Sequence, residues 1–389
     1  MLRKMPVLLL LTMVTIVWIN PYLPLPVKQF LYAVSLSIKS LIIFVLPFII
    51  FTLLLKAMIS MSRNATSIIL LILFCVCLSN FTSTFLSHYI GEWVYQSNLS
   101  LILPNNVQGL APAWTFTLPK LVENSQAMFA GIILGVIFGS LQSVIALRVA
   151  TQLDVVVHKM LKSFTYLIPL FIMGFIVKLT SDGVLHTIVK DYALIFLMIA
   201  LAQFGYILLA YLALNNFNWV KASRNIKDML PAAMTGFSAM SSAAAMPLTI
   251  AGVANNAKHK ELAESVVPAT VNIHLVGDCF AIPIFAYAVM KSYGMAEPAL
   301  FQYLIFVSYF VIAKFSVAAI PGGGIVVMLP VLESCLGFNT EMLSLITALY
   351  VLFDPVITGA NVLGNGAFAK LIDRLVSLRP NMDTELAES

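Results

Sequence analysis

Four polar residues are spaced along one apolar segment near the C-terminus so that they can share a single face. Asp354, Thr358, Asn361 and Asn365 stand at i, i+4, i+7 and i+11 within "DPVITGANVLGN", and this spacing lines them up along one stripe of an α-helix. A carboxylate inside an apolar helix needs a partner or a polar cavity. The stripe is therefore a candidate wall of an internal binding site, unless Asp354 only pairs within the helix bundle.

The chain that carries this stripe is very apolar. Its 389 residues are 60% hydrophobic and 10% charged, with a mean hydropathy of +0.97, which is too apolar for a water-soluble domain. Apolar runs of helical length recur along it, whereas the alternating segments of a membrane barrel do not. We therefore predict an all-α integral membrane protein. The net charge of +5 is scattered over short loops and favours no nucleic-acid surface.

Eight apolar segments are predicted to span the membrane, near residues 6–24, 28–60, 66–91, 127–147, 155–180, 188–214, 262–291 and 340–376. The basic residues Arg3 and Lys4 precede the first segment, and Lys56 and Arg63 lie between the second and third segments. Because basic residues accumulate on the inner side, the N-terminus is expected in the cytoplasm and the protein in the cell (inner) membrane. A signal peptide is the alternative for the first segment, but no small-residue cleavage pattern follows it.

Two further apolar regions, about 228–257 and 297–338, are interrupted in the middle. The first turns at "GFSAMSSAAAMP" and the second at "AIPGGGIVVMLP", which leaves arms shorter than the ~20 residues of a spanning helix. We predict two re-entrant helical hairpins whose irregular tips are buried in protein or line a polar cavity. One interrupted segment in each of two corresponding parts is typical of a transporter built from inverted repeats.

Four motifs add a family resemblance. They are "MSSAAAMPLT" at 240–249, "VVPATVNIHLVGDC" at 266–279, "AIPGGG" at 319–324 and "DPVITGANVLGN" at 354–365. In order and spacing they resemble the first hairpin tip, the unwound seventh helix, the second hairpin tip and the eighth helix of the dicarboxylate/amino acid:cation symporters, which include glutamate and aspartate transporters. The resemblance covers roughly 220–376 and is looser from the N-terminus to about 150.

The resemblance implies a homotrimer with an elevator transporter fold, in which a transport part slides along a fixed scaffold. The implied division of the chain is 1–62 for scaffold helices 1 and 2, 63–92 for helix 3 of the transport part, 93–184 for scaffold helices 4 and 5, 185–377 for the remaining transport part, and 378–389 for a solvated tail.

Roles for the polar stripe follow from the same resemblance. Asp354 is expected to hold the ammonium group of a substrate, Thr358 to orient that end, and Asn361 to bind the α-carboxylate. Backbone amides at the two hairpin tips are expected to complete the carboxylate pocket, near Ser241, Ser242, Gly322 and Gly323.

Three positions depart from the family pattern near the substrate side chain. Ile357 stands where members with acidic substrates carry an arginine, and Tyr350 stands where the carboxylate partner of that arginine is found. Losing both partners together avoids a buried unpaired charge. Asp278 replaces a threonine, and an anion there would repel an acidic side chain. These changes predict a neutral, or alternatively a cationic, amino acid as cargo.

The expected sodium sites depart further. Val276 and Asn365 replace two sodium-binding carboxylates, His274 opens the altered helix-seven motif, and Lys314 stands at a position that helps enclose another sodium ion. Lys314 could substitute for sodium or carry a proton, and His274 could also carry a proton because imidazole titrates near neutral pH. The candidate ion-coupling or cation-substituting residues are Lys314, His274, Asn272, Asn365 and Val276.

Plainer interpretations of these residues stay open at this point. Lys314 could extend its ammonium to an interface, and His274 could simply hydrogen-bond in the core. Asp278 could pair with Lys314 or His274, which would weaken the cargo argument.

The function predicted from the sequence is secondary transport of a small neutral amino acid, independent of sodium and either proton-coupled or exchange-type. The alternatives are a sodium-independent carrier of dicarboxylates or acidic amino acids, and a non-transporting, sensor-like homologue. An enzyme is not expected, because the chain lacks a G-x-S-x-G elbow and an H-E-x-x-H helix. Neither a cofactor nor a metal is expected, and the predicted partners are a small substrate, protons and the lipid bilayer.

Overall fold

The structure is a computed structural model. It describes residues 5–63, 67–97, 109–119, 121–122, 124–182, 185–317 and 322–377, so the basic residues Arg3 and Lys4 and the tail at 378–389 lie outside the described residues. Every regular element in these ranges is a helix, as predicted. In chain order they are α1 (Met5–Ile19), η2 (Asn20–Tyr22), α2 (Leu25–Arg63), α3 (Ser67–Gln96), α4 (Asn124–Ser140), α5 (Val144–Ser181), α6 (Leu185–Leu214), α7 (Trp219–Ala239), α8 (Ser242–Asn256), α9 (Lys260–Thr270), α10 (Val276–Ser292), α11 (Leu300–Lys314), α12 (Gly323–Leu336) and α13 (Thr340–Ser377).

Three described helical stretches are long and apolar enough to cross a membrane by themselves. They are Leu70–Gln96, Tyr192–Leu214 and Thr340–Ser377, and six shorter apolar helices accompany them. A helix needs about 20 apolar residues to span the hydrocarbon core. The membrane character predicted from composition therefore agrees with the structure, whereas the number of eight spans stays a prediction.

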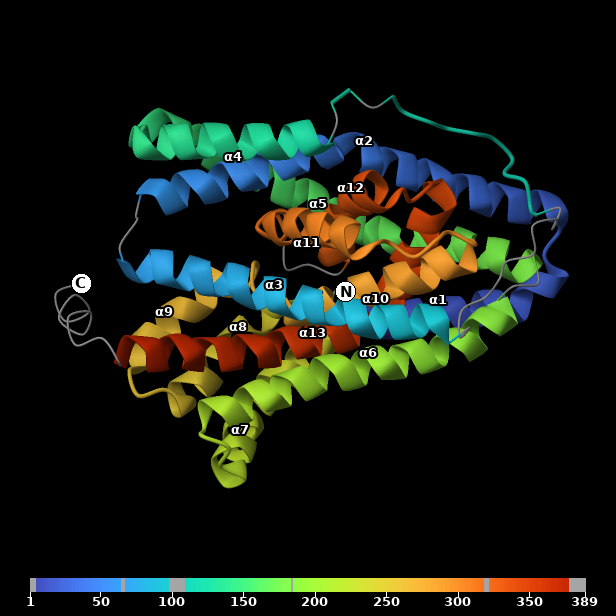
Figure 1. The fold of residues 1–389 in the computed structure, drawn as a ribbon. Helices are drawn as coiled ribbons and strands as arrows, with labels where there is room; N and C mark the ends of the chain where they lie inside the picture. The colour runs from blue at the N-terminus through green and yellow to red at the C-terminus, as the bar shows by residue number, and fades with distance from the viewer. Residues whose placement is uncertain are drawn as a thin grey trace.

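The helices pack in two sets. In the first set, α2 lies along α4 and α5, and α1 packs on α5. In the second, α13 is surrounded by α6, α7, α8, α9 and α10, while α3 packs on α10 and α11. Figure 1 shows α2 and α4 side by side at the top and α3, α13 and α6 below them. The long helix α13, which carries the polar stripe, is therefore central to the second set.

Both predicted interruptions are present. Between α7 and α8, Met240 adopts a left-handed conformation with φ of 50°, and Ser241 caps the start of α8 with its side chain. Between α11 and α12, Gly322 has φ of 72°, a conformation that glycine adopts without steric cost. The second tip is described only in part, since residues 318–321 of "AIPGGG" lie outside the described ranges. At both helix interruptions, described backbone groups lie outside regular helical hydrogen bonding.

Two predicted segments have different bounds in the structure. The segment predicted at 127–147 ends with α4 at Ser140, because Ser143 caps a new helix that runs on as α5. The segment predicted at 262–291 is divided into α9 and α10 by the non-helical stretch 271–275. That division agrees with the unwound seventh helix that the family resemblance implied.

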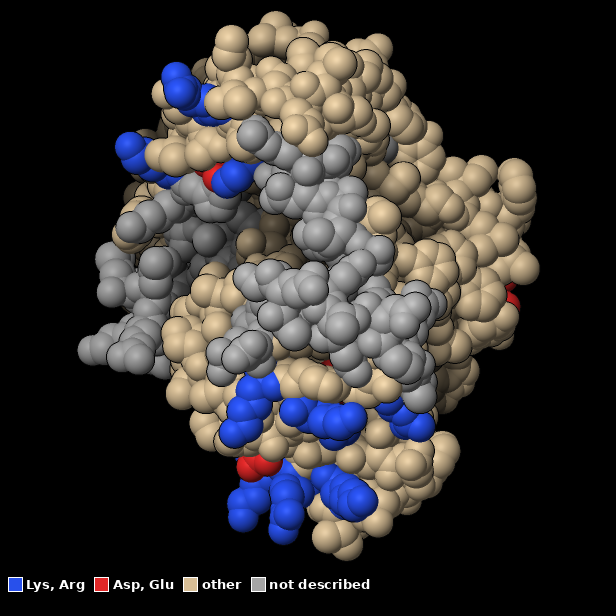
Figure 2. All heavy atoms as spheres, turned by 90° about the vertical axis from the view of Figure 1, so that its left-hand side faces the viewer, with Lys and Arg blue, Asp and Glu red and all other residues tan. Residues whose placement is uncertain are grey.

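Basic side chains gather at one end of the helices. Figure 2 shows the face on the left of Figure 1, with Lys and Arg side chains on its lower part, where α7 and the end of α13 lie. The exposed basic residues of α7, of the α8–α9 connection and of α13 are Lys221, Arg224, Lys227, Lys258, Lys260 and Arg374. By the rule that basic residues accumulate on the inner side, this end is the predicted cytoplasmic one.

Candidate functional site

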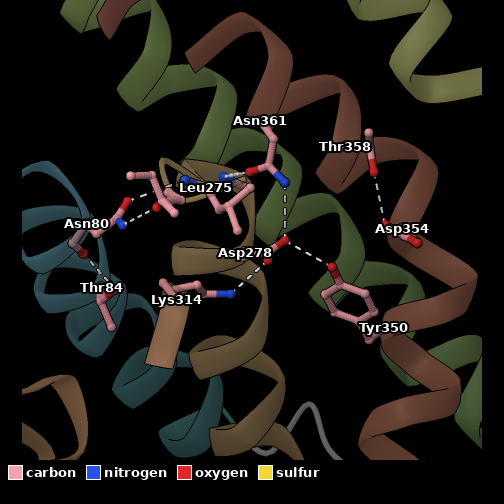
Figure 3. A network of polar contacts seen from close by, with 11 residues as sticks. Asn80, Thr84, Leu275, Asp278, Lys314, Tyr350, Asp354, Thr358 and Asn361 are labelled. Atoms are coloured by element: carbon pink, nitrogen blue, oxygen red, sulfur yellow. Dashed lines mark hydrogen bonds and ion pairs between the residues drawn. The ribbon is translucent and has the colours of Figure 1, made fainter. Parts of the chain in front are cut away.

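Asp278 is the centre of a buried polar network between three helices. Its side chain lies in the first turn of α10 and is 1% exposed. The Nζ of Lys314 lies 2.7 Å from one carboxylate oxygen, while the Tyr350 hydroxyl and the Asn361 Nδ2 donate to the other at 3.0 and 3.2 Å. Figure 3 shows these three side chains converging on Asp278 from α11 and α13. The carboxylate is therefore paired and hydrogen-bonded on both oxygens.

Lys314 is fully buried, so the interpretation that it extends to an interface is wrong. Its residue is 0% exposed, and its Nζ also lies 4.7 Å from the ring centroid of Phe310. Lys314 is the last residue of α11 and Asp278 lies in the first turn of α10. Helix C-termini favour cations and helix N-termini favour anions, so both helix ends stabilise the charges that they carry. The open alternative that Asp278 pairs with Lys314 is the arrangement observed.

Asp354, on α13, is the centre of a second set of buried hydrogen bonds beside this network. Its two oxygens accept hydrogen bonds from the Gly322 N–H at 2.8 Å and from the Thr358 hydroxyl at 2.9 Å. Asp354 is 2% exposed and Thr358 is 4% exposed. The described tip of the second hairpin thus closes directly onto the candidate ammonium-binding carboxylate.

Asn361 connects the stripe on α13 to the start of α10. Its Oδ1 accepts a hydrogen bond from the Gly277 N–H at 2.8 Å, while its Nδ2 donates to Asp278. One amide thereby satisfies a backbone N–H that the helix start leaves without an intrahelical acceptor. The expected stripe of Asp354, Thr358 and Asn361 is assembled on one face, and Asn361 joins it to Asp278.

The unwound stretch 271–275 is held by α3. The Asn80 side chain donates to the Ile273 carbonyl at 2.7 Å and accepts from the Leu275 N–H at 3.4 Å. His274 lies between Ser79, 2.9 Å from its Nε2, and Asn365, 3.3 Å from its Nδ1. The two Asn80 contacts satisfy backbone groups that a regular helix would pair internally.

The candidate ion-coupling residues lie in two parts of the structure. His274 and Val276 lie at the start of α10, where His274 contacts Asn365 of α13, and His274 and Val276 line a cavity of about 220 Å³. Lys314 lies in the Asp278 network. Asn272 is half-buried in the unwound stretch.

Three further residues of the substrate-site prediction lie in the core or at the start of a helix. Ile357 is 0% exposed and packs in the core between the helices. Ser241 caps α8 by accepting from the Ala244 N–H at 3.2 Å, and Ser242 is buried in the first turn. Of the two glycines, Gly322 binds Asp354, and Gly323 begins α12. The carboxylate pocket expected at these tips stays a prediction.

Sequence reasoning missed Ser79 and Asn80 and treated Tyr350 only as a lost carboxylate. The pair "SN" lies in the middle of an apolar segment of α3. Polar side chains at such a position mark an internal contact in membrane helices, and that signal was available.

Comparison with known proteins defines the class. The model of the sodium:dicarboxylate symporter family matches residues 6–375. The chain therefore belongs to this family of transporters, and the resemblance noted from the four motifs is confirmed. No curated protein matches the chain in sequence. Transport and symport across a membrane, with a small-molecule substrate, are what membership supports.

Proposed function

We propose that this protein transports a small neutral amino acid without sodium, using Asp354 to bind the ammonium group and the Lys314–Asp278 pair as built-in charges. The observation that carries the proposal is the buried pair itself, with Nζ and carboxylate 2.7 Å apart and side-chain exposures of 0% and 1%. A neighbouring carboxylate, Asp354, accepts only neutral hydrogen-bond donors in the described structure.

The charges of the site favour a ligand that carries an ammonium group. Asp278 and Lys314 cancel each other, which leaves Asp354 as the charge to be balanced if it is ionised. A buried carboxylate is costly without a counter-charge, and a ligand ammonium supplies one. An amino acid would then take the place of the Gly322 N–H at Asp354, so binding and movement of the second hairpin tip would be linked.

The argument for a neutral side chain changes in one respect. Asp278 is paired with Lys314, so it is not a free anion that repels acidic cargo. The preference instead rests on Ile357, a buried apolar side chain at the position of the expected arginine, and on the negative charge of Asp354. A second carboxylate in the cargo would be desolvated without a dedicated cation.

The same pair supports the proposed independence of sodium. Lys314 places an amino group, 2.7 Å from the Asp278 carboxylate, where the family resemblance locates part of a sodium site, and Val276 and Asn365 supply no carboxylate. Sodium binds oxygen-rich sites with compensating negative charge, whereas the Asp278 carboxylate is already paired with Lys314. Exchange or facilitated diffusion then needs no coupling ion, and proton coupling through Lys314 or His274 is the alternative.

The architecture belongs to the proposal. We propose that α1, α2, α4 and α5 form the scaffold, and that α3 and α6 to α13 form the moving part of a homotrimeric elevator. The packing of the helices in two sets supports this division. The N-terminus and the basic end of α7 are proposed to face the cytoplasm of the inner membrane.

Proteoliposomes provide the test. Purified protein is reconstituted with unlabelled amino acid inside, and uptake of labelled serine, alanine, aspartate and succinate is measured with and without sodium. We expect serine or alanine to exchange equally well in both conditions. Strict dependence on sodium, or preference for aspartate or succinate, would overturn the proposal. Binding without uptake would favour the sensor-like alternative, and uptake driven by a pH gradient would favour proton coupling.

A further inference from the structure

A cavity lies between α3, α6, the start of α10 and α13, and His274 and Val276 form part of its wall. It measures about 220 Å³ and is lined mainly by apolar side chains. On α6 the lining includes Ile207, Ala210 and Leu214, and on α13 it includes Gly364 and Leu371. Spacings of three, four and seven residues lie on one helix face, so the cavity is elongated along the two helices.

One end of the cavity lies next to basic residues. Leu214 and Leu371 line this end, and Arg374, one turn beyond Leu371, donates to the Leu214 carbonyl at 3.1 Å. Lys370 lies near the acidic Asp373 and near the basic Lys221 and Arg374. Arg374 and Lys221 are both exposed. An apolar cavity thus ends at a cluster of positive charge.

The end of the α6–α7 loop and the first residues of α7 add an exposed apolar tip beside this cluster. Phe217 is 73% exposed, Trp219 60% and Val220 71%. Arg374 also donates to the Asn216 side chain at 2.9 Å, and Asn216 and Phe217 have positive φ values of 52° and 57°. Tryptophan and basic side chains together are typical of the membrane–water interface.

We infer that this end of the molecule is a binding site for one anionic phospholipid. An acyl chain lies in the cavity between α6 and α13, and the phosphate lies against Lys221, Arg224 and Arg374, with Trp219 at the level of the headgroups. An apolar cavity of ~150 Å³ is large enough to bind a small hydrocarbon, and this one is larger. Basic residues at the membrane surface attract anionic lipids. The site is separate from Asp354 and does not depend on the identity of the cargo.

Lipid retention tests the acyl-chain contact. The protein is extracted from membranes that contain phosphatidylglycerol and phosphatidylcholine, purified, and its retained lipids are counted by mass spectrometry. Ala210→Phe fills the cavity and is expected to lower retained phosphatidylglycerol at least threefold. The matched control Ala193→Phe, at an exposed position of the same helix, should retain as much as the unmodified protein. Equal retention by Ala210→Phe would overturn the assignment of the cavity.

Fluorescence quenching tests the headgroup contact in the folded protein. Trp18, Trp93 and Trp114 are replaced by Phe, so that Trp219 is the reporter, and vesicles contain either brominated phosphatidylglycerol or brominated phosphatidylcholine in an equal background. We expect at least twofold stronger quenching by the anionic lipid, lost in Lys221→Gln/Arg224→Gln and kept in the control Arg148→Gln/Lys159→Gln. Equal quenching by both lipids in the unmodified protein would contradict the proposal.

Discussion

The Lys314 ammonium and the Asp278 carboxylate lie 2.7 Å apart in a fully buried position, although the two residues are 36 positions apart in the sequence. Burying two charges is costly, and their attraction offsets the cost only with good geometry and further hydrogen bonds. Tyr350 and Asn361 supply those hydrogen bonds to the carboxylate. The four residues should therefore behave as one unit when any of them is changed.

The first prediction concerns the coupling of this ion pair. Lys314→Met leaves Asp278 as a buried charge without its partner, so we expect a loss of about 3–5 kcal/mol in the free energy of unfolding. Adding Asp278→Asn removes that charge and should recover most of the loss. Unfolding of the purified protein in detergent, measured for both single variants and the double variant, gives the coupling energy. A double variant no more stable than Lys314→Met would mean that the two side chains act independently.

The second prediction tests whether Lys314 substitutes for a bound cation. In Lys314→Ala the ammonium is removed while Asp278 keeps its negative charge, so sodium or methylammonium should bind and raise the unfolding temperature of this variant. A tenfold excess of ion over its dissociation constant would contribute roughly 1.4 kcal/mol. The unmodified protein and Lys314→Ala/Asp278→Asn are the controls and should not respond. If all three proteins respond alike, Lys314 does not stand in a cation site.

The polar stripe and the hairpin breaks could be predicted because each is encoded locally. Asp354, Thr358 and Asn361 follow helical spacing, and Gly322 lies in a run of three glycines that favours a break. The family resemblance supplied the roles that spacing alone does not. The family resemblance also supplied the prediction of the unwound stretch before α10, because residues 271–275 include no glycine or proline.

Pairings between distant helices could not be predicted in the same way. Lys314 and Asp278 were each recognised as unusual, but the sequence left open whether Lys314 faced solvent, and whether Asp278 paired with it or with His274. Only the position of the end of α11 relative to the start of α10 decides this, and that position depends on long-range contacts. A serine in an apolar helix often hydrogen-bonds to its own backbone, so the polar pair Ser79 and Asn80 marks an internal contact without naming His274 as the partner.

The third prediction concerns the close approach of the second hairpin to the network. A Cβ added at Gly324 would collide with the Tyr350 hydroxyl and the Asp278 carboxylate. Gly324→Ala should therefore separate α12 from the network, lower the unfolding temperature and abolish measurable transport. The control is Gly205→Ala, where a Cβ meets nothing within 4 Å, and where alanine favours the helix by about 1 kcal/mol. Similar transport by both variants would show that the hairpin tolerates displacement at this position.

The fourth prediction separates the ammonium contact from general stability. Asp354→Asn keeps the shape of the side chain and its acceptor for the Gly322 N–H, yet removes the charge that a ligand ammonium would pair with. We expect amino acid affinity to fall at least 100-fold, which is about 2.7 kcal/mol, while the unfolding temperature without ligand is unchanged or higher because a buried carboxylate is gone. Thr358→Val removes one hydrogen bond to Asp354 and should cost about 1 kcal/mol, or roughly fivefold in affinity. Isothermal titration with serine or alanine, together with the unfolding temperature of each variant, makes both measurements. Unchanged affinity in Asp354→Asn would place the ammonium group elsewhere in the protein.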